Sequence, residues 1–115
     1  MSRDLSFWKT STTVETDNKA VYTALSDEKY LAYIEEIPMD KIQTDFNEVF
    51  NRWSNNNNMH YEKGNESFQL MITKQFVRAD CYGMTESSMN MIIDILLKYN
   101  CPLYDSAIDV RFEVN

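Results

Sequence analysis

The clearest strand pattern in this chain is the stretch ESFQLMITKQFVRADCY, residues 66–82. In its first half, apolar side chains recur at every second position: Phe68, Leu70 and Ile72. A second run, 76–82, is rich in β-branched and aromatic residues and follows the polar break Thr73-Lys74-Gln75. A period of two is typical of strands that bury one face, so we expect a β-hairpin here, with residues 59–63 as a candidate third strand.

Amphipathic helices are predicted on either side of this hairpin. One apolar stripe, at i, i+4, i+7, i+8 and i+11, comprises Ile42, Phe46, Val49, Phe50 and Trp53. The other, at i, i+3, i+4, i+7 and i+8, comprises Met89, Ile92, Ile93, Leu96 and Leu97. Thr85 can cap the second of these helices, and Pro102 prevents it from continuing. A shorter helix is expected between residues 18 and 26, where apolar residues again recur at helical spacing.

Strands are expected near both ends of the chain, over residues 4–10, at 103–104 and in the alternating run 108–114. The resulting order is strand, helix, helix, hairpin, helix, strand. This order is typical of an α+β fold with a split βαβ (ferredoxin-like) sheet, because each helical stripe needs a sheet face to cover. We therefore expect one domain over residues 1–115, an antiparallel or mixed sheet, and helices packed on one face.

The composition is that of a globular protein with an acidic surface. Of the 115 residues, 43% are hydrophobic and 25% are charged. Eleven Lys and Arg residues against 18 Asp and Glu residues give 11 − 18 = −7. This charge disfavours nucleic acids and anionic membranes as partners, because phosphate neutralisation needs clustered cations. A basic partner protein fits the charge better.

No apolar run approaches the ~18 residues that a membrane-spanning helix needs. The sequence starts Met1-Ser2-Arg3-Asp4 and has no apolar signal region after it, so we expect synthesis and residence in the cytoplasm. In that compartment Cys81 and Cys101 are expected to be reduced thiols.

The sequence offers few groups for catalysis. Its single histidine is His60, and a small hydrolase using it would need Asp80, Tyr104 and Asp105 to converge on the same pocket. Cysteine and histidine lack the close spacing that organises zinc, and two glycines are too few for a phosphate-binding loop. We expect no catalytic residue, no metal and no cofactor.

Acidic residues are densest between residues 27 and 48. Seven carboxylates against two lysines leave five net negative charges in these 22 residues. An ordinary solvated helix face is one interpretation. The other is a recognition surface, because aromatic anchors among charges of one sign give buried area and steer a cationic protein. The candidate contact residues are Asp27, Glu28, Tyr30, Tyr33, Glu35, Glu36, Asp40, Asp45 and Glu48.

Three phrases carry a resemblance to a known group of proteins: DLSFWK at residues 4–9, RADCYGM at 78–84 and YNCPLYD at 99–105. The chain resembles small bacterial proteins with such an opening strand and a similar Cys-Pro-Leu-Tyr-Asp turn. Some of these are similar to immunity proteins encoded beside contact-dependent or other polymorphic toxins. Ser106 departs from the pattern, which usually has proline there.

The resemblance implies tight binding to a cognate toxin domain, commonly a nuclease with a basic cleft. Under this hypothesis the contacts are made first by residues 27–40 of the candidate set and then by Asp45 and Glu48. The alternative class is a self-associating regulatory or structural module, in which a sheet edge near Phe112 and Val114 pairs with a second copy to form a homodimer.

Overall fold

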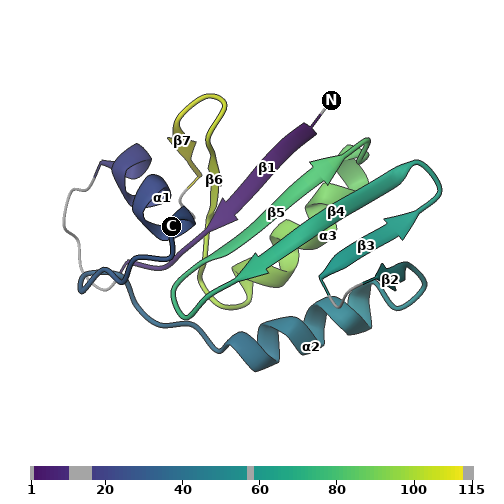
Figure 1. Ribbon diagram of the computed structural model, residues 1–115, viewed down its shortest axis with the longest axis horizontal. Coiled ribbons are helices and arrows are strands. Elements are labelled where there is room, and N and C mark those ends of the chain that lie inside the picture. The colour runs from purple at the N-terminus through teal and green to yellow at the C-terminus, as the bar shows by residue number, and fades with distance from the viewer. Residues whose placement is uncertain (1, 11–16, 57–58, 113–115) are drawn as a thin grey trace.

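The computed structural model describes residues 2–10, 17–56 and 59–112. The helices in these ranges are α1 (Asn18–Ser26), α2 (Met39–Val49) and α3 (Glu86–Leu97). The strands are β1 (Ser2–Phe7), β2 (Ser54–Asn56), β3 (His60–Lys63), β4 (Glu66–Ile72), β5 (Val77–Tyr82), β6 (Leu103–Asp105) and β7 (Val110–Arg111). The strands form a single sheet in the order β2-β3-β4-β5-β1-β6-β7 (Figure 1).

The predicted α+β class and the predicted hairpin are confirmed. β4 and β5 pair from Ser67 opposite Tyr82 to Ile72 opposite Val77, and β3 adds the third strand. Every strand pair in the described part of the chain is antiparallel. The sheet is richer in strands than a β-α-β-β-α-β arrangement, so the ferredoxin-like assignment stays a prediction.

Helices cover both faces of the sheet, so the prediction that they pack on one face is wrong. The reason lies in three adjacent apolar pairs near one end of the central strands: Phe7-Trp8, Phe76-Val77 and Leu103-Tyr104. Successive side chains of a strand point to opposite faces, so each pair places one apolar group on either side of the sheet. One side is covered by α2 and α3, and the other by α1.

Two hydrophobic clusters result. The larger cluster lies between the sheet and the helices α2 and α3, and its buried aromatic residues are Phe7, Phe46, Phe50, Tyr61 and Phe68. The smaller cluster lies between the sheet and α1 and comprises Trp8, Val21, Leu25, Ile34, Phe76 and Tyr104. Figure 1 shows α3 behind β4 and β5, and α1 beside the end of the sheet that β6 and β7 form. No helix in the described ranges is long and apolar enough to span a bilayer.

Candidate functional site

The acidic segment predicted from the sequence, residues 27–48, starts after α1 and includes most of α2. Its first part is a loop that runs past the end of β1 and the turn between β4 and β5. The Glu35 N–H donates to the Lys9 carbonyl at 2.8 Å, and the Ile37 N–H donates to the Lys74 carbonyl at 2.7 Å. Ile34 also forms an isolated antiparallel bridge with Thr10. The loop is therefore tied to the sheet by its backbone.

A buried glutamine fixes the same loop from the side of the β4–β5 turn. The Gln75 side chain is 2% exposed, and its Nε2 donates to the carbonyls of Leu31 (2.7 Å) and Ile34 (2.8 Å). The Leu31 N–H donates to Gln75 Oε1 at 2.9 Å. One side chain thus satisfies three backbone groups, which would otherwise each carry the cost of an unpaired polar group. Gln75 therefore ties the first part of the loop to the β4–β5 turn, in addition to the backbone hydrogen bonds of Glu35 and Ile37.

The two tyrosines of this loop are exposed on that fixed backbone. Tyr30 is 62% exposed and Tyr33 is 37% exposed. The Tyr30 hydroxyl donates to Glu36 Oε2 at 3.0 Å, and this hydrogen bond together with the charge of Glu36 raises the pKa of Tyr30. The tyrosine therefore stays neutral in ordinary buffers and orients one of the acidic side chains of the loop.

The fold neutralises part of the acidic segment. Lys9 lies 3.7 Å from Glu35, and Lys98, the C-cap residue of α3, lies 3.0 Å from Asp45. The Tyr99 hydroxyl also donates to Asp45, and this hydrogen bond, with that of Lys98, lowers the pKa of the carboxyl. The same contact raises the pKa of Tyr99 to about 12. Glu35 and Asp45 therefore have cationic partners inside the chain, which the sequence alone did not predict.

Two hollows border the segment, and Glu28 and Asp40 each line one of them. One, of about 170 Å³, lies beside Tyr30 and is also lined by Glu28 and Lys74. The other, of about 280 Å³, lies against α2 and is lined by Asp40, Lys41, Thr44, Asp45 and Tyr99. At 100° per residue, Asp40 and Glu48 share the polar arc of α2, away from the buried Ile42 and Phe46. The predicted contact residues thus lie on the loop and on α2, where Asp40 and Glu48 are exposed and Asp45 faces Lys98 and Tyr99.

The four residues of the hydrolase hypothesis do not share a pocket. His60 contacts Gln69 (3.1 Å) and Glu62 (2.9 Å) on β3 and β4, whereas Asp80 lies one strand further, about 10 Å away. Tyr104 is buried in the smaller cluster, and its hydroxyl donates to Asp109 at 2.7 Å. Asp105 is the next residue of β6, so its side chain points to the opposite face of the sheet.

The cysteines are buried free thiols. Burial raises the pKa of Cys81 to about 12 and that of Cys101 to about 11, so both are protonated near neutral pH. Among residues 2–10, 17–56 and 59–112, no group of three or more His, Cys, Asp and Glu side chains is arranged to hold a metal ion.

Sequence reasoning missed a polar network on the side of the sheet that α1 covers in part. Asp4 accepts from the Tyr22 hydroxyl at 2.5 Å and from Ser106 Oγ at 2.8 Å. Arg78 donates to Asp80 at 2.9 Å and lies 3.8 Å from Asp4. Asp4 and Ser106 are 102 residues apart. Only the pairing of β1 with β5 and β6 brings these groups together, so no local pattern could have indicated them.

The chain was compared with known proteins. No protein-family model matches the sequence, and no curated protein shows significant similarity to it.

Proposed function

We propose that this chain is an immunity protein, which binds and neutralises a cognate bacterial toxin domain with nuclease activity and acts in the cytoplasm without a reactive centre of its own. Its binding surface comprises Asp27, Glu28, Tyr30, Tyr33, Glu35, Glu36, Asp40, Asp45 and Glu48, which we call the acidic surface. The sequence resemblance to immunity proteins suggests the class of partner. The net charge of −7 supports a basic one.

The observation that carries this proposal is a largely exposed tyrosine on an ordered loop. Tyr30 is 62% exposed, while Gln75 holds the neighbouring backbone through three hydrogen bonds. Aromatic side chains dominate the energetics of many interfaces, and a loop that is already ordered loses little entropy on binding. An exposed aromatic anchor with this support is suited to binding another protein.

The conformation of Glu28 adds independent support. Its φ is 62°, in the left-handed region that glycine and asparagine usually occupy at the end of a helix. A glutamate there costs about 1 kcal/mol relative to glycine, and the residue is exposed, so no buried contact offsets the cost. A carboxylate at a strained, exposed position beside Tyr30 is accessible to a partner and therefore supports a role in binding.

Co-expression tests the proposal. The toxin domain encoded by the open reading frame beside this gene should kill cells when expressed alone, and this chain should restore growth and co-purify with the domain. Charge reversal at Glu28, Glu36 and Asp40 should abolish rescue, whereas Glu62→Lys on β3 should not. Full rescue by the charge-reversed chain would move the interface elsewhere, and absence of rescue by the native chain would overturn the proposal.

A second candidate function, self-association, is favoured by one observation. β7 lies at the edge of the sheet, and three apolar residues at this edge are exposed: Ile108 (59%), Val110 (39%) and Phe112 (46%). Such an edge can pair with another strand. Val114, the other residue of this hypothesis, lies outside the described ranges. Light scattering separates the two functions, because self-association through β7 predicts a dimer whose mass falls to that of the monomer in Val110→Lys.

A further inference from the structure

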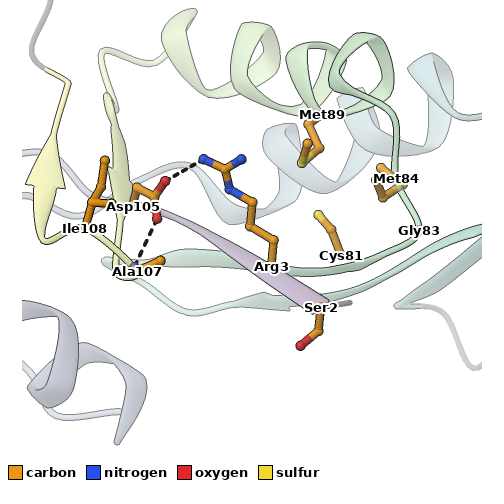
Figure 2. A pocket seen from close by; sticks show the side chains of 9 residues that line it. All are labelled: Ser2, Arg3, Cys81, Gly83, Met84, Met89, Asp105, Ala107 and Ile108. Atoms are coloured by element: carbon orange, nitrogen blue, oxygen red, sulfur yellow. Dashed lines mark hydrogen bonds and ion pairs between the residues drawn. The ribbon is translucent and has the colours of Figure 1, made fainter.

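A larger cavity lies at the opposite end of β1 from the acidic surface. Its volume is about 510 Å³, and its principal lining residues are Arg3, Cys81, Met84, Met89, Asp105 and Ile108 (Figure 2). Small-molecule sites typically enclose roughly 300–1,000 Å³, so the volume suits a small organic ligand. Arg3 and Lys9 are six residues apart along β1 and its continuation, which separates this cavity from the acidic surface by about 20 Å.

The walls of the cavity are mostly apolar. Met84 lies on the segment that joins β5 to α3, Met89 lies at the start of α3, and Ile108 lies in the turn between β6 and β7 (Figure 2). Methionine side chains adapt their shape to a ligand more easily than branched ones. Burial raises the pKa of the Cys81 thiol to about 12, so this group contributes an apolar surface and no nucleophile. The walls therefore suit a hydrocarbon body.

One ion pair interrupts the apolar walls. An Nη atom of Arg3 donates to Asp105 Oδ2 at 2.5 Å, and the Ala107 N–H donates to Asp105 Oδ1 at 3.0 Å. The Asp105 side chain is 3% exposed, whereas that of Arg3 is 52% exposed. Both carboxylate oxygens are thus engaged inside the protein, and the guanidinium is the accessible partner. Figure 2 shows it between Asp105 and Met89.

We propose that this cavity binds a small apolar carboxylate, whose oxygens accept from the N–H groups of Arg3 that Asp105 does not use. A guanidinium has five N–H donors, and its planar fork matches a carboxylate. A neutral ligand would cover the guanidinium without supplying a charged acceptor, and an ammonium group would meet a cation. This site is independent of the proposed immunity function.

Methyl NMR tests the proposal on the intact chain, because the methionines are distributed over the fold. With 13C-labelled methionine methyl groups, octanoate should shift the Met84 and Met89 signals saturably and leave those of Met39, Met59 and Met71 in place. Octan-1-ol and octylamine should bind about tenfold more weakly, since they lose a charge-assisted hydrogen bond. N-acetyl-leucine is a second carboxylate probe and resembles the C-terminal residue of a polypeptide. Tighter binding of octanoate would indicate a fatty-acid-like ligand, and tighter binding of N-acetyl-leucine would indicate a polypeptide C-terminus.

Variants supply the controls. Ala107→Trp adds bulk at an exposed position of the cavity rim and should abolish the octanoate shifts, whereas Ala20→Trp, at an exposed position of α1, should not. Replacing the ion pair by Arg3→Gln with Asp105→Asn should bring octanoate and octan-1-ol to equal affinity, with folding verified by circular dichroism. The proposal is overturned if octanoate leaves the Met84 and Met89 methyls unmoved. It is also overturned if all methionine methyls move alike, or if the neutral and cationic analogues bind as well as octanoate.

Discussion

The two faces of the sheet are stabilised in different ways. In the larger cluster, aromatic rings pack on one another under α2 and α3, with centroids 4.8 Å apart for Tyr61 and Phe68 and 4.9 Å for Phe50 and Phe68. In the smaller cluster, polar groups accompany the rings: Tyr22 donates to Asp4, and the Arg111 guanidinium lies 5.0 Å from the centre of the Trp8 ring. The acidic loop attaches to this second face through Ile34 and Leu31.

This difference suggests how stability and binding are divided. The larger cluster contains most of the buried apolar side chains and supplies most of the hydrophobic stabilisation. The smaller cluster, together with Gln75, connects α1 and the loop to the sheet. Disturbing the larger cluster should therefore unfold the whole chain, whereas disturbing the smaller cluster should first release the proposed binding surface.

The largest effect is expected in the larger cluster. Phe46→Ala removes a fully buried ring and should lower the free energy of unfolding by about 3–5 kcal/mol, a large share of the stability of a small domain. Leu25→Ala in the smaller cluster is the comparison and should cost about 2–3 kcal/mol. Urea titration measures both. If Leu25→Ala lowers the free energy of unfolding as much as Phe46→Ala or more, the larger cluster does not supply most of the stability.

Gln75 provides the next test. Gln75→Leu removes three hydrogen bonds and should lower the free energy of unfolding by about 2–3 kcal/mol, because the backbone groups of Leu31 and Ile34 stay buried or must rearrange. Hydrogen exchange should accelerate at the Leu31, Glu35 and Ile37 amides, while β4 and β5 stay protected. Gln69→Leu on the exposed side of β4 is the matched control. If hydrogen exchange in the loop is unchanged in Gln75→Leu, the hydrogen bonds of the Gln75 side chain do not hold the loop.

The contact between Tyr22 and Asp4 predicts a pH dependence for the α1 face. Burial would raise the pKa of Asp4, but hydrogen bonds from Tyr22 and Ser106 and the charge of Arg78 outweigh it and lower the pKa below 3.8. The stabilisation is therefore complete above the unfolded pKa and disappears as the pH falls through the lower folded value. Tyr22→Phe should cost about 1–2 kcal/mol at neutral pH.

Urea midpoints at neutral pH and at about pH 3 check this prediction. The difference in urea midpoint between the native chain and Tyr22→Phe should be smaller at the acidic pH than at neutral pH. Tyr30→Phe, which also loses a hydroxyl bonded to a carboxylate but at an exposed site, should show almost no gap at either pH. A gap for Tyr22→Phe that widens in acid would mean that the hydroxyl does not stabilise the ionised carboxyl.

The smallest expected effect has the opposite sign. Glu28→Gly relieves the left-handed conformation at φ 62°, and this should offset the greater entropy of glycine in the unfolded chain, so stability should rise by about 0.5 kcal/mol or less. Binding to the toxin domain should weaken at the same time, because a carboxylate of the acidic surface is lost. Thermal unfolding and a binding assay together test this. A stabilised variant with unchanged affinity would remove Glu28 from the interface.

Sequence patterns predicted the parts of the fold that depend on local periodicity. The hairpin around Gln75, the Ile42 and Phe46 positions of α2 and the cap of α3 by Thr85 were all accessible in this way, and the Thr85 side chain does accept from the Ser88 N–H at 3.1 Å. Val49 of the predicted stripe is instead 41% exposed, because α2 ends there and Phe50 and Trp53 follow the helix. The face that α1 covers was missed, although the adjacent apolar pair Phe7-Trp8 indicates it. Such pairs predict that helices pack on both faces of the sheet only once the direction of each strand is known.

The sequence predicted which residue types the candidate site contains, but not how they are arranged in space. The sequence places carboxylates and tyrosines at residues 27–48, but it does not show that Lys98 pairs with Asp45, or that Gln75 holds the loop from 41–44 residues away. The cavity at Arg3 and Asp105 depends on a contact across 102 residues. Such long-range contacts follow from strand order, which local periodicity does not specify.

The most direct test of the central claim is calorimetric titration of the cognate toxin domain with Tyr30→Ala/Tyr33→Ala and with Tyr82→Ala. Tyr82 is 45% exposed on β5, so it matches the loop tyrosines in chemistry and lies outside the acidic surface. The double variant should bind at least about thirtyfold more weakly than the native chain, and Tyr82→Ala should bind within about threefold of it. Native affinity in the double variant, or loss of binding in Tyr82→Ala alone, would contradict the proposed interface.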